Sequence, residues 1–229
     1  MFQAKIFVTA GLALIISLFA LLACAASANS DASKVGIGTD STQEVKLSGG
    51  AGNPIAGKGK SELCQGCHGE DGNSPDSMTP KLAGQNASYI IKQLRNYQIG
   101  VRSHPIMSAV AAAVIEEDLD DIGAYFSSRT IMQGNGSVNK IGKDLYHRGD
   151  MSRMIVACVN CHGVIGEGKA SANSIFPVIG GQHKDYLLGQ LVNFKAGDRS
   201  NSPGGVMNIM VQRMTADELE ALADYVAGL

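Results

Sequence analysis

The chain repeats one short motif together with the segments that follow it. Cys-x-x-Cys-His-Gly occurs at residues 64–69 and again at 158–163. The repeat continues beyond the motif without gaps inside its longer segments, where 80–102 matches 177–199 and 117–126 matches 217–226. Self-similarity over this length predicts two copies of one structural unit. It constrains the fold more than any other feature, because each copy must be stable with roughly 90 residues.

The repeat sets the expected domain boundaries. We expect a first domain at residues 55–132, a linker at 133–140 and a second domain at 141–229. The linker region is rich in Gly and Asn, which are typical of connecting segments. Residues 29–54 are rich in Ser, Gly, Asp and Lys with little apolar pattern, which predicts a flexible lead-in.

Both copies have the pattern of helical structure. Apolar residues recur at helical spacing in the middle of each copy and again at its end, and strand patterns are nearly absent. These residues are Ile90, Leu94 and Tyr97, with Leu187, Leu191 and Phe194, and then Leu119, Ile122 and Phe126, with Leu219, Leu222 and Val226. Thr215 and Glu218 predict a capping box at the last helix, whereas Ile115 stands at that capping position in the first copy. The sequence therefore predicts an all-α tandem duplication.

The N-terminus resembles an export signal. Residues 1–28 hold one lysine, a long apolar run and the small residues Ala26-Ser27-Ala28, which suit cleavage before Asn29. Two other interpretations stay open, a lipoprotein signal that ends at Cys24 and an uncleaved anchor. All three export the rest of the chain, and we expect a periplasmic protein. The net charge of −2 excludes the basic face that binding to nucleic acid requires.

The repeated motif is typical of covalent haem attachment. Cys64 and Cys67, three residues apart on a helical turn, can both reach one edge of a porphyrin, and His68 follows as an iron ligand. Cys158, Cys161 and His162 repeat this set. A structural zinc site needs two cysteine pairs roughly 15–20 residues apart, and a thioredoxin-like pair needs a βαβ setting. Neither fits, so the sequence predicts two covalently bound haem c groups, one in each helical domain.

Each haem iron then needs a sixth ligand. Apart from the two motif histidines, no histidine has a histidine at the matching position of the other copy. Met107 and Met207 do match, each after a loop that begins Gly-x-Arg-Ser and contains a proline. We predict that a flexible loop delivers these soft thioether sulfurs to iron. Met210 and Met214 have no methionine counterpart and are expected in the core.

Ligation by His and Met has a predictable consequence for chemistry. With both axial positions of the iron filled, no coordination site is open to a substrate, and the reduction potential is raised relative to bis-His ligation. Such a centre moves electrons one at a time. The sequence therefore indicates an electron carrier rather than an enzyme.

Together these features resemble the dihaem cytochrome c4 family over about residues 55–229. The resemblance rests on the two haem motifs, the two methionines, the closing helices, and the segments Pro-x-Leu-Ala-Gly-Gln at 80–85 and Pro-x-x-Gly-Gly-Gln at 177–182. It implies two class I cytochrome c domains about a pseudo-twofold axis, with the haem propionates facing each other across the interface. It also implies that Pro80 and Pro177 support the motif histidines through their carbonyl groups.

The resemblance further implies a place in respiration. Members of this family transfer electrons in the periplasm between a membrane quinol-oxidising complex, or another donor, and a terminal oxidase or reductase, often at the membrane surface. A flavocytochrome dehydrogenase, for example a sulfide-oxidising one, has a cytochrome subunit of the same two-domain build, and a stable flavin subunit would reveal it. A dihaem peroxidase needs one iron that opens a position for peroxide, and the matched methionines argue against it.

Overall fold

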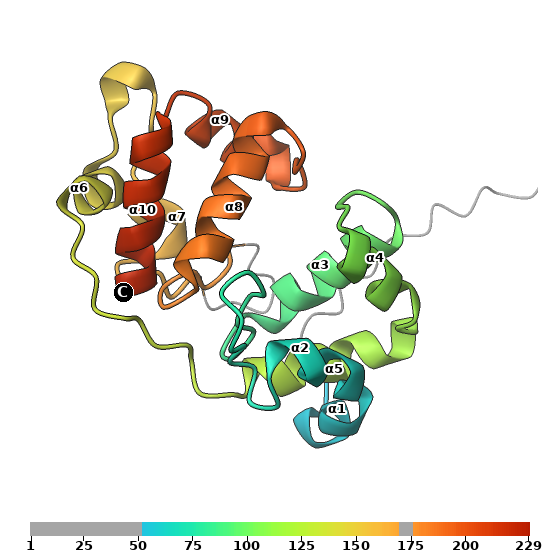
Figure 1. The fold of residues 1–229 in the computed structure, drawn as a ribbon. Coiled ribbons are helices and arrows are strands. Elements are labelled where there is room, and N and C mark those ends of the chain that lie inside the picture. The colour runs from blue at the N-terminus through green and yellow to red at the C-terminus, as the bar shows by residue number, and fades with distance from the viewer. Residues whose placement is uncertain (1–51, 170–175) are drawn as a thin grey trace, which may run out of the picture. The chain divides into compact units, whose positions relative to one another are not determined.

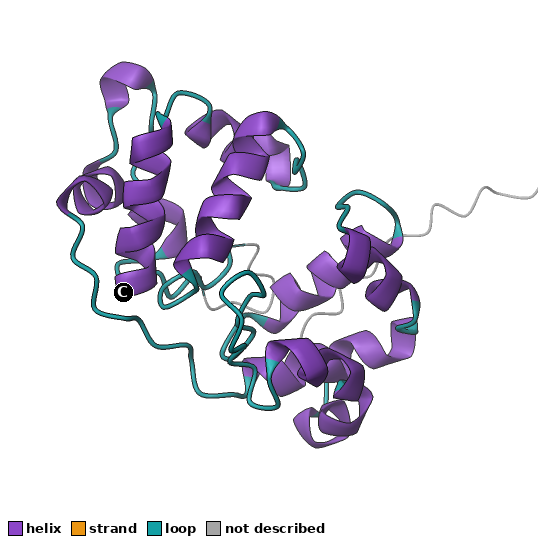
Figure 2. Cartoon of the chain, viewed as in Figure 1, coloured by secondary structure: helices purple, strands orange, loops and turns teal. Residues whose placement is uncertain are grey.

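The computed structural model describes residues 52–169 and 176–229, all of which belong to one compact unit. The predicted signal, Cys24 and nearly all of the predicted lead-in lie outside the described residues. Within these ranges the chain is helical, and its one β-bridge pairs Asp150 with Ile155 (Figures 1 and 2). None of the described helices is both long enough and apolar enough to span a membrane.

The order of elements repeats between the two halves. The first half contains α1 (Pro54–Lys60), α2 (Glu62–His68), α3 (Ala87–Gln98), α4 (Pro105–Ala112), η1 (Glu116–Asp118) and α5 (Leu119–Ser127). The second half contains α6 (Lys140–Arg148), η2 (Met151–Arg153), α7 (Val159–His162), α8 (Lys184–Ala196), η3 (Pro203–Gly205), α9 (Val206–Val211) and α10 (Ala216–Gly228). The all-α duplication predicted from sequence is confirmed.

Each half has its own hydrophobic core, built on the predicted helix faces. Of the twelve predicted apolar positions, all but Leu191 are buried, and Leu191 packs against the second core. The predicted capping box is present, with Glu218 N donating to Thr215 Oγ1 at 3.2 Å and Thr215 N donating to Glu218 at 2.9 Å. Ile115 provides no side-chain cap, and the turn η1 precedes α5 instead.

Helices α1 and α6 were not predicted, and each crosses the last helix of its half. Figure 1 shows α1 against α5 and α6 against α10. The crossing is close because a glycine lies at the contact. A Cβ atom on Gly57 would stand 2.0 Å from the carbonyl oxygen of Asp121, and one on Gly142 would stand 2.0 Å from that of Ala221. Helix crossings this tight exclude any side chain at these two positions.

The linker packs against both halves. Residues 131–139 have no regular structure, but Met132 is only 4% exposed and its N–H donates to Ala83 O at 3.3 Å. Further along, Asn135 N donates to Ala227 O at 3.0 Å. Backbone bonds to the first half and then to the second hold the linker in place.

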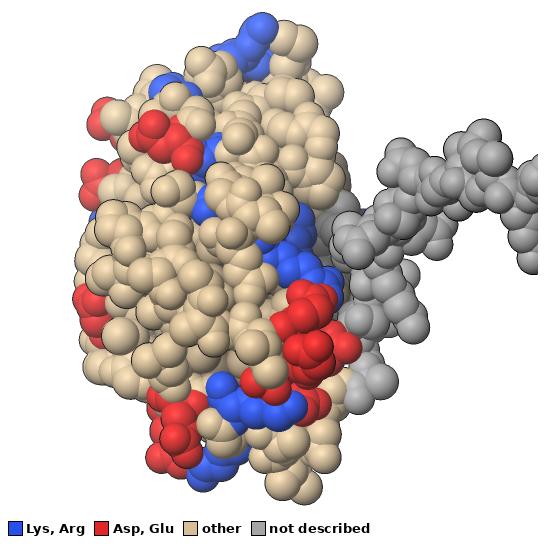
Figure 3. Space-filling view, turned by 90° about the vertical axis from the view of Figure 1, so that its right-hand side faces the viewer, with Lys and Arg blue, Asp and Glu red and all other residues tan. Residues whose placement is uncertain are grey.

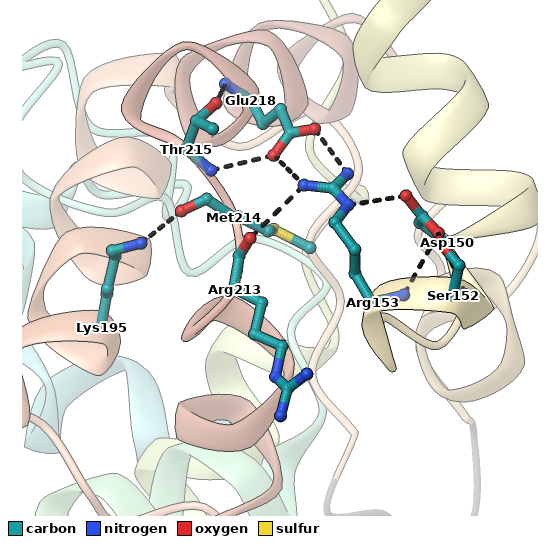
Figure 4. A network of polar contacts seen from close by, with 8 residues as sticks. All are labelled: Asp150, Ser152, Arg153, Lys195, Arg213, Met214, Thr215 and Glu218. Atoms are coloured by element: carbon teal, nitrogen blue, oxygen red, sulfur yellow. Dashed lines mark hydrogen bonds and ion pairs between the residues drawn. The ribbon is translucent and has the colours of Figure 1, made fainter.

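The second half carries a loop between α6 and α7 that has no equivalent between α1 and α2. Arg153 anchors this loop (Figure 4), with two hydrogen bonds to the carboxylate of Glu218 at 2.7 and 3.0 Å and one to Asp150 at 2.6 Å. Because Glu218 also belongs to the capping box, the loop is bound directly to the start of α10. These bonds lower the pKa of Glu218, and hydrogen bonds from Ser152 and Arg153 lower that of Asp150 to about 2.

Candidate functional site

The first motif lies on one short helix. Cys64, Cys67 and His68 are in the last turns of α2, and Gly69 ends the helix with φ of +83°. In the second half Cys158 is the N-cap of α7 and His162 is its last residue, followed by Gly163 with φ of +85°. The left-handed backbone that follows each histidine suits glycine. Each motif therefore places two thiols and one imidazole on a single turn of helix.

Both motif histidines are held in the same way. His68 Nδ1 lies 2.8 Å from Pro80 O, and His162 Nδ1 lies 3.1 Å from Pro177 O. Because a carbonyl can only accept, Nδ1 carries the proton and Nε2 keeps its lone pair. The described residues form no hydrogen bond to either Nε2 atom. The support by the two prolines that the family resemblance implied is confirmed.

Burial favours the neutral form of both imidazoles. His68 is 5% exposed and His162 is 8% exposed. Desolvation lowers the pKa of each, and the hydrogen bond to the proline carbonyl only partly opposes it. A neutral imidazole with a free Nε2 is the form that binds a metal ion. Both histidines are therefore prepared for ligation.

The motif cysteines are free thiols, and none of the four forms a disulfide. Burial raises the pKa of the Cys64 thiol, and it raises that of Cys158 to about 11. Both groups are consequently protonated at neutral pH. No cluster of three or more His, Cys, Asp or Glu side chains that could hold a metal ion by itself occurs within residues 52–169 and 176–229.

The two methionines lie at the edges of the cores. Met107 and Met207 are partly buried and pack against the core of their own half. The structure differs from the predicted loop delivery, because Met107 is in the first turn of α4 and Met207 in that of α9. Pro105 starts α4 and His104 accepts a hydrogen bond from Met107 N, so a helix begins where a loop was expected. Met214 is in the core as predicted, and Met210 is partly buried.

The halves meet through two glutamines at equivalent positions of the repeat. Gln85 donates to Val178 O at 2.8 Å and accepts from Val178 N at 2.9 Å. Gln182 donates to Lys81 O at 2.9 Å and accepts from Lys81 N at 2.9 Å. Both glutamines are 4% exposed. The contact therefore has the symmetry of a pseudo-twofold axis.

Two arginines obey the same symmetry. Arg102 donates to Tyr186 Oη at 3.2 Å and Arg199 to Tyr89 Oη at 2.9 Å, each across the interface. Both guanidinium groups also donate to Gln190 Oε1, at 2.8 and 2.7 Å. They are 8% and 7% exposed, and no ion pair among the described residues includes them. The interface thus buries two positive charges beside neutral acceptors.

The electrostatic effect of these arginines extends to their neighbours. Burial acts to raise the pKa of Tyr89, but Arg199 and Arg102 outweigh it and lower that pKa. Burial, Arg199 and Arg102 together lower the pKa of Lys92 to about 8. Buried charges without a partner cost several kcal/mol each, on the order estimated for single ions. An anion beside the cluster would therefore stabilise it.

The residues present fit haem c. Each half offers the two thiols that form thioether bonds, an imidazole with a free Nε2 and a thioether sulfur. Haem also carries two propionate carboxylates, which would supply anions that stabilise the buried Arg102 and Arg199. One more observation agrees with this fit, since Gln93 Nε2 is buried in the same cluster without an acceptor.

The interface residues were missed in the sequence analysis. The signal was available, because four of the polar pairs that are identical between the two copies lie with both members at this interface. These are Gln85 and Gln182, Tyr89 and Tyr186, Gln93 and Gln190, and Arg102 and Arg199. A core does not require identical polar residues, whereas a symmetric contact between the copies does.

This chain is similar to known proteins over most of its length. A family model described as Cytochrome c matches residues 140–229. A cytochrome c4 from Pseudomonas aeruginosa is 36% identical over 186 residues, which cover 80% of this chain and 92% of that protein. The crystal structure of reduced recombinant cytochrome c4 from Pseudomonas stutzeri has a TM-score of 0.72 at 36% identity, covering 78% of this chain and 100% of that chain.

A further relative has a name that describes its role. A thiosulfate dehydrogenase electron acceptor from Stutzerimonas stutzeri is 34% identical over 193 residues, which cover 82% of this chain and 85% of that protein. Relatives of this identity and coverage, together with the thiols and imidazole that both halves present, identify the protein class. The chain belongs to the cytochrome c4 family, whose members are electron carriers with covalently bound haem c and redox protein partners, and not enzymes.

Proposed function

We propose that this chain is a periplasmic dihaem cytochrome that carries single electrons between two redox proteins. One haem c is held by Cys64, Cys67, His68 and Met107. The other is held by Cys158, Cys161, His162 and Met207. The observation that carries the proposal is that each half presents the same donor set, with the histidine Nδ1 bound to a proline carbonyl and Nε2 free.

Each residue of the set has a separate task. The two thiols would form thioether bonds that keep the haem attached, and the histidine and methionine would ligate its iron. The prolines orient the imidazoles, which lowers the reorganisation that accompanies a change of oxidation state. Haem c bound in this way would supply an Fe(III)/Fe(II) couple for one electron. Arg102 and Arg199 would neutralise propionate carboxylates at the interface between the halves.

Exposed apolar side chains favour transient docking of partners. Leu63 and Ile106 flank the motif and the methionine of the first half, and Val164 and Ile209 those of the second. All four are at least 60% exposed. The charged side chains in Figure 3 lie in small mixed groups separated by uncharged surface. Small apolar contacts with few charges suit electron-transfer complexes that form and separate quickly.

The location and the pathway follow from the same proposal. The signal-like residues 1–28 export the chain, and acylation at Cys24 or peripheral association would keep it near the membrane. There it would accept electrons from a membrane quinol-oxidising complex or another donor, and deliver them to a terminal oxidase or reductase. The alternatives are the cytochrome subunit of a flavocytochrome dehydrogenase and, less favoured because Met107 and Met207 match, a dihaem peroxidase.

One relative favours a second donor. Because a 34% identical protein is named a thiosulfate dehydrogenase electron acceptor, we also consider a role as acceptor for a sulfur-oxidising dehydrogenase. Stopped-flow reduction of the oxidised protein by a thiosulfate dehydrogenase and by a quinol-oxidising complex would separate the two roles. The physiological donor should be at least tenfold faster, and its rate should depend on ionic strength.

The experiment that tests the proposed function is expression with a working haem-maturation system. The purified protein should exceed its polypeptide mass by two haem groups and show a reduced-state α band. Replacing Cys64 and Cys67 by Ala should remove one haem, and replacing Cys158 and Cys161 should remove the other. A protein with the bare polypeptide mass contradicts the proposal.

A further inference from the structure

The symmetry between the halves is broken where α3 meets the loop that precedes Met207. Lys92 of α3 has Gly189 as its counterpart on α8, and Asn201 has His104 as its counterpart. Lys92 Nζ donates to the carbonyl oxygen of Asn201 at 2.7 Å and to Asn96 Oδ1 at 3.0 Å. Lys92 of the first half therefore bonds to the second half, and within the described ranges no equivalent bond runs from position 189 of the second half to the first.

The backbone of Asn201 accepts the hydrogen bond from Lys92, and its side chain forms further hydrogen bonds to α3. It is 7% exposed, and its Nδ2 donates to Gln93 Oε1 at 2.9 Å and to Asn96 Oδ1 at 2.8 Å. Its Oδ1 accepts from Arg199 Nε at 2.9 Å. Both acceptors of Asn201 Nδ2, Gln93 and Asn96, belong to α3 of the first half. Asn201 is thus held by the first half as well as by Arg199 of its own half.

The fixed segment leads directly to Met207. Ser202, the next residue after Asn201, accepts a hydrogen bond from Met207 N at 3.1 Å. Asn208, which follows Met207, donates to Arg199 O at 2.8 Å. The loop from Arg199 to Ser202 is therefore bonded both to α3 of the first half and to the turn of α9 that carries Met207.

The equivalent segment of the first half has no such support. His104 is exposed, and its Nδ1 accepts from Met107 N within the same helix start at 3.3 Å. Gly189 offers no side chain toward it, although space for a Cβ atom is open there. The two arginines each bond to a tyrosine across the interface, so this contact is made in both directions. Lys92 with Asn201 is a contact whose counterpart, between Gly189 and His104, is absent from the described residues.

We propose that Lys92 is a positioning residue that holds the Met207 loop from the opposite half, so that ligation by Met207 depends on contact between the halves and ligation by Met107 does not. This inference rests on the proposed function, because it takes Met207 as an iron ligand. It makes the second haem site sensitive to any event that loosens the interface.

The test measures how readily an added ligand displaces each methionine from oxidised iron. Imidazole can bind only when the sulfur has left, so its apparent affinity scales with the population of the open loop. The charge-transfer band of methionine-ligated ferric haem reports the displacement. The part of this band that is lost in the Met107→His or the Met207→His variant comes from that site. Reduction potentials are recorded as a second readout.

Lys92→Met should raise the imidazole affinity of the Met207 site by about tenfold, as expected for loss of one charge-assisted hydrogen bond. The Met107 site should change by less than about twofold. Lys92→Arg, which keeps a charged donor, should recover most of the wild-type affinity. Lys184→Met removes an exposed lysine that pairs with Glu220, and it should affect neither site. Because glycine occupies the matching position, loss of this side chain is compatible with the fold.

Two results would overturn the inference in distinguishable ways. Equal affinities in wild type and Lys92→Met, or an equal increase at both sites, would show that Lys92 does not hold the Met207 loop, while the ligand assignment stands. If Met207→His left the wild-type spectrum and imidazole titration unchanged, Met207 would not be a ligand, and both the proposed site and this inference would fail.

Discussion

Gln85 and Gln182 bind the backbone of each other's half through two matched pairs of hydrogen bonds, all between 2.8 and 2.9 Å long. Each amide satisfies one N–H and one C=O that would otherwise be unpaired, at the buried Val178 and the partly buried Lys81. Since an unsatisfied buried polar group costs more than a hydrogen bond gains, these two side chains are a stability feature of the interface.

We predict that Gln85→Leu and Gln182→Leu each lower the free energy of unfolding by about 2 kcal/mol, because two backbone groups lose their partners. The two losses should be similar, since the contacts are equivalent. Urea unfolding of the haem-loaded protein followed by the haem absorbance measures them. Gln212→Leu, at an exposed position, is the control and should change stability by less than about 0.5 kcal/mol.

Replacing either candidate axial methionine should change the reduction potential of one haem and leave that of the other haem unchanged. Met107→His and Met207→His should each lower one of the two reduction potentials by about 0.1 V or more, within the roughly 0.8 V that haem ligand sets span. An optical potentiometric titration resolves the two steps. Two unchanged potentials in either variant would exclude that methionine as a ligand.

The helix crossing at Gly57 predicts a difference between two glycines of the same helix. Gly57→Ala should destabilise the protein by about 1–3 kcal/mol, because its Cβ would collide with the backbone of Asp121. A Cβ atom on Gly59 would have no atom beyond its chain neighbours and its own helix backbone within 4 Å, so Gly59→Ala should stabilise α1 by about 0.5–1 kcal/mol. Gly142→Ala should behave like Gly57→Ala. Thermal unfolding compares the three variants, and equal effects of Gly57→Ala and Gly59→Ala would contradict the close crossing.

The Arg153 cluster predicts a pH dependence with a defined sign. The folded pKa values of Glu218 and Asp150 lie below their ordinary values of 4.5 and 3.8, with Asp150 at about 2. Their contribution to stability is therefore complete above pH 4.5 and is lost as pH falls toward 2. Arg153→Met should lower the urea midpoint at neutral pH, and the difference from wild type should shrink steadily through this range.

A matched variant tests whether this effect is specific to the cluster. Arg148 pairs with Asp144, and the side chains are 78% and 49% exposed. Exposed pairs of this kind contribute little, so Arg148→Met should leave the urea midpoint nearly unchanged at every pH. A pH-independent loss in Arg153→Met would mean that the arginine acts through packing rather than through its charge.

The sequence predicted those parts of the fold that leave a periodic apolar signal. Leu119, Ile122 and Phe126 mark one face of α5, and that face is buried. Helix α1 escaped prediction because its buried residue is Gly57, which periodicity of apolar residues cannot detect. Ion pairs and backbone contacts across the chain, such as Lys60 with Asp121, then fix a helix that its own residues do not specify.

For the candidate site, the motif residues were predictable because their chemistry is tied to local spacing. The carbonyl of Pro80 beside His68 was implied only by family resemblance, since twelve residues separate the two in sequence. The position of Met107 in a helix turn depends on a cap from His104 and a proline at the helix start, which the loop interpretation overlooked. Contacts between the halves depend on tertiary placement, and only identity between the copies indicated them.

The reciprocal glutamine contact also has a consequence for quaternary structure. Gln85 and Gln182 occupy the same position of the repeat, and so do the residues that receive them, Val178 and Lys81. One copy alone therefore carries both sides of the contact, and two separate copies would close into a homodimer by this patch. Joining them in one polypeptide replaces a concentration-dependent equilibrium with a fixed effective concentration, on the order of millimolar for a short tether. Pairing of the halves is then independent of how dilute the protein becomes.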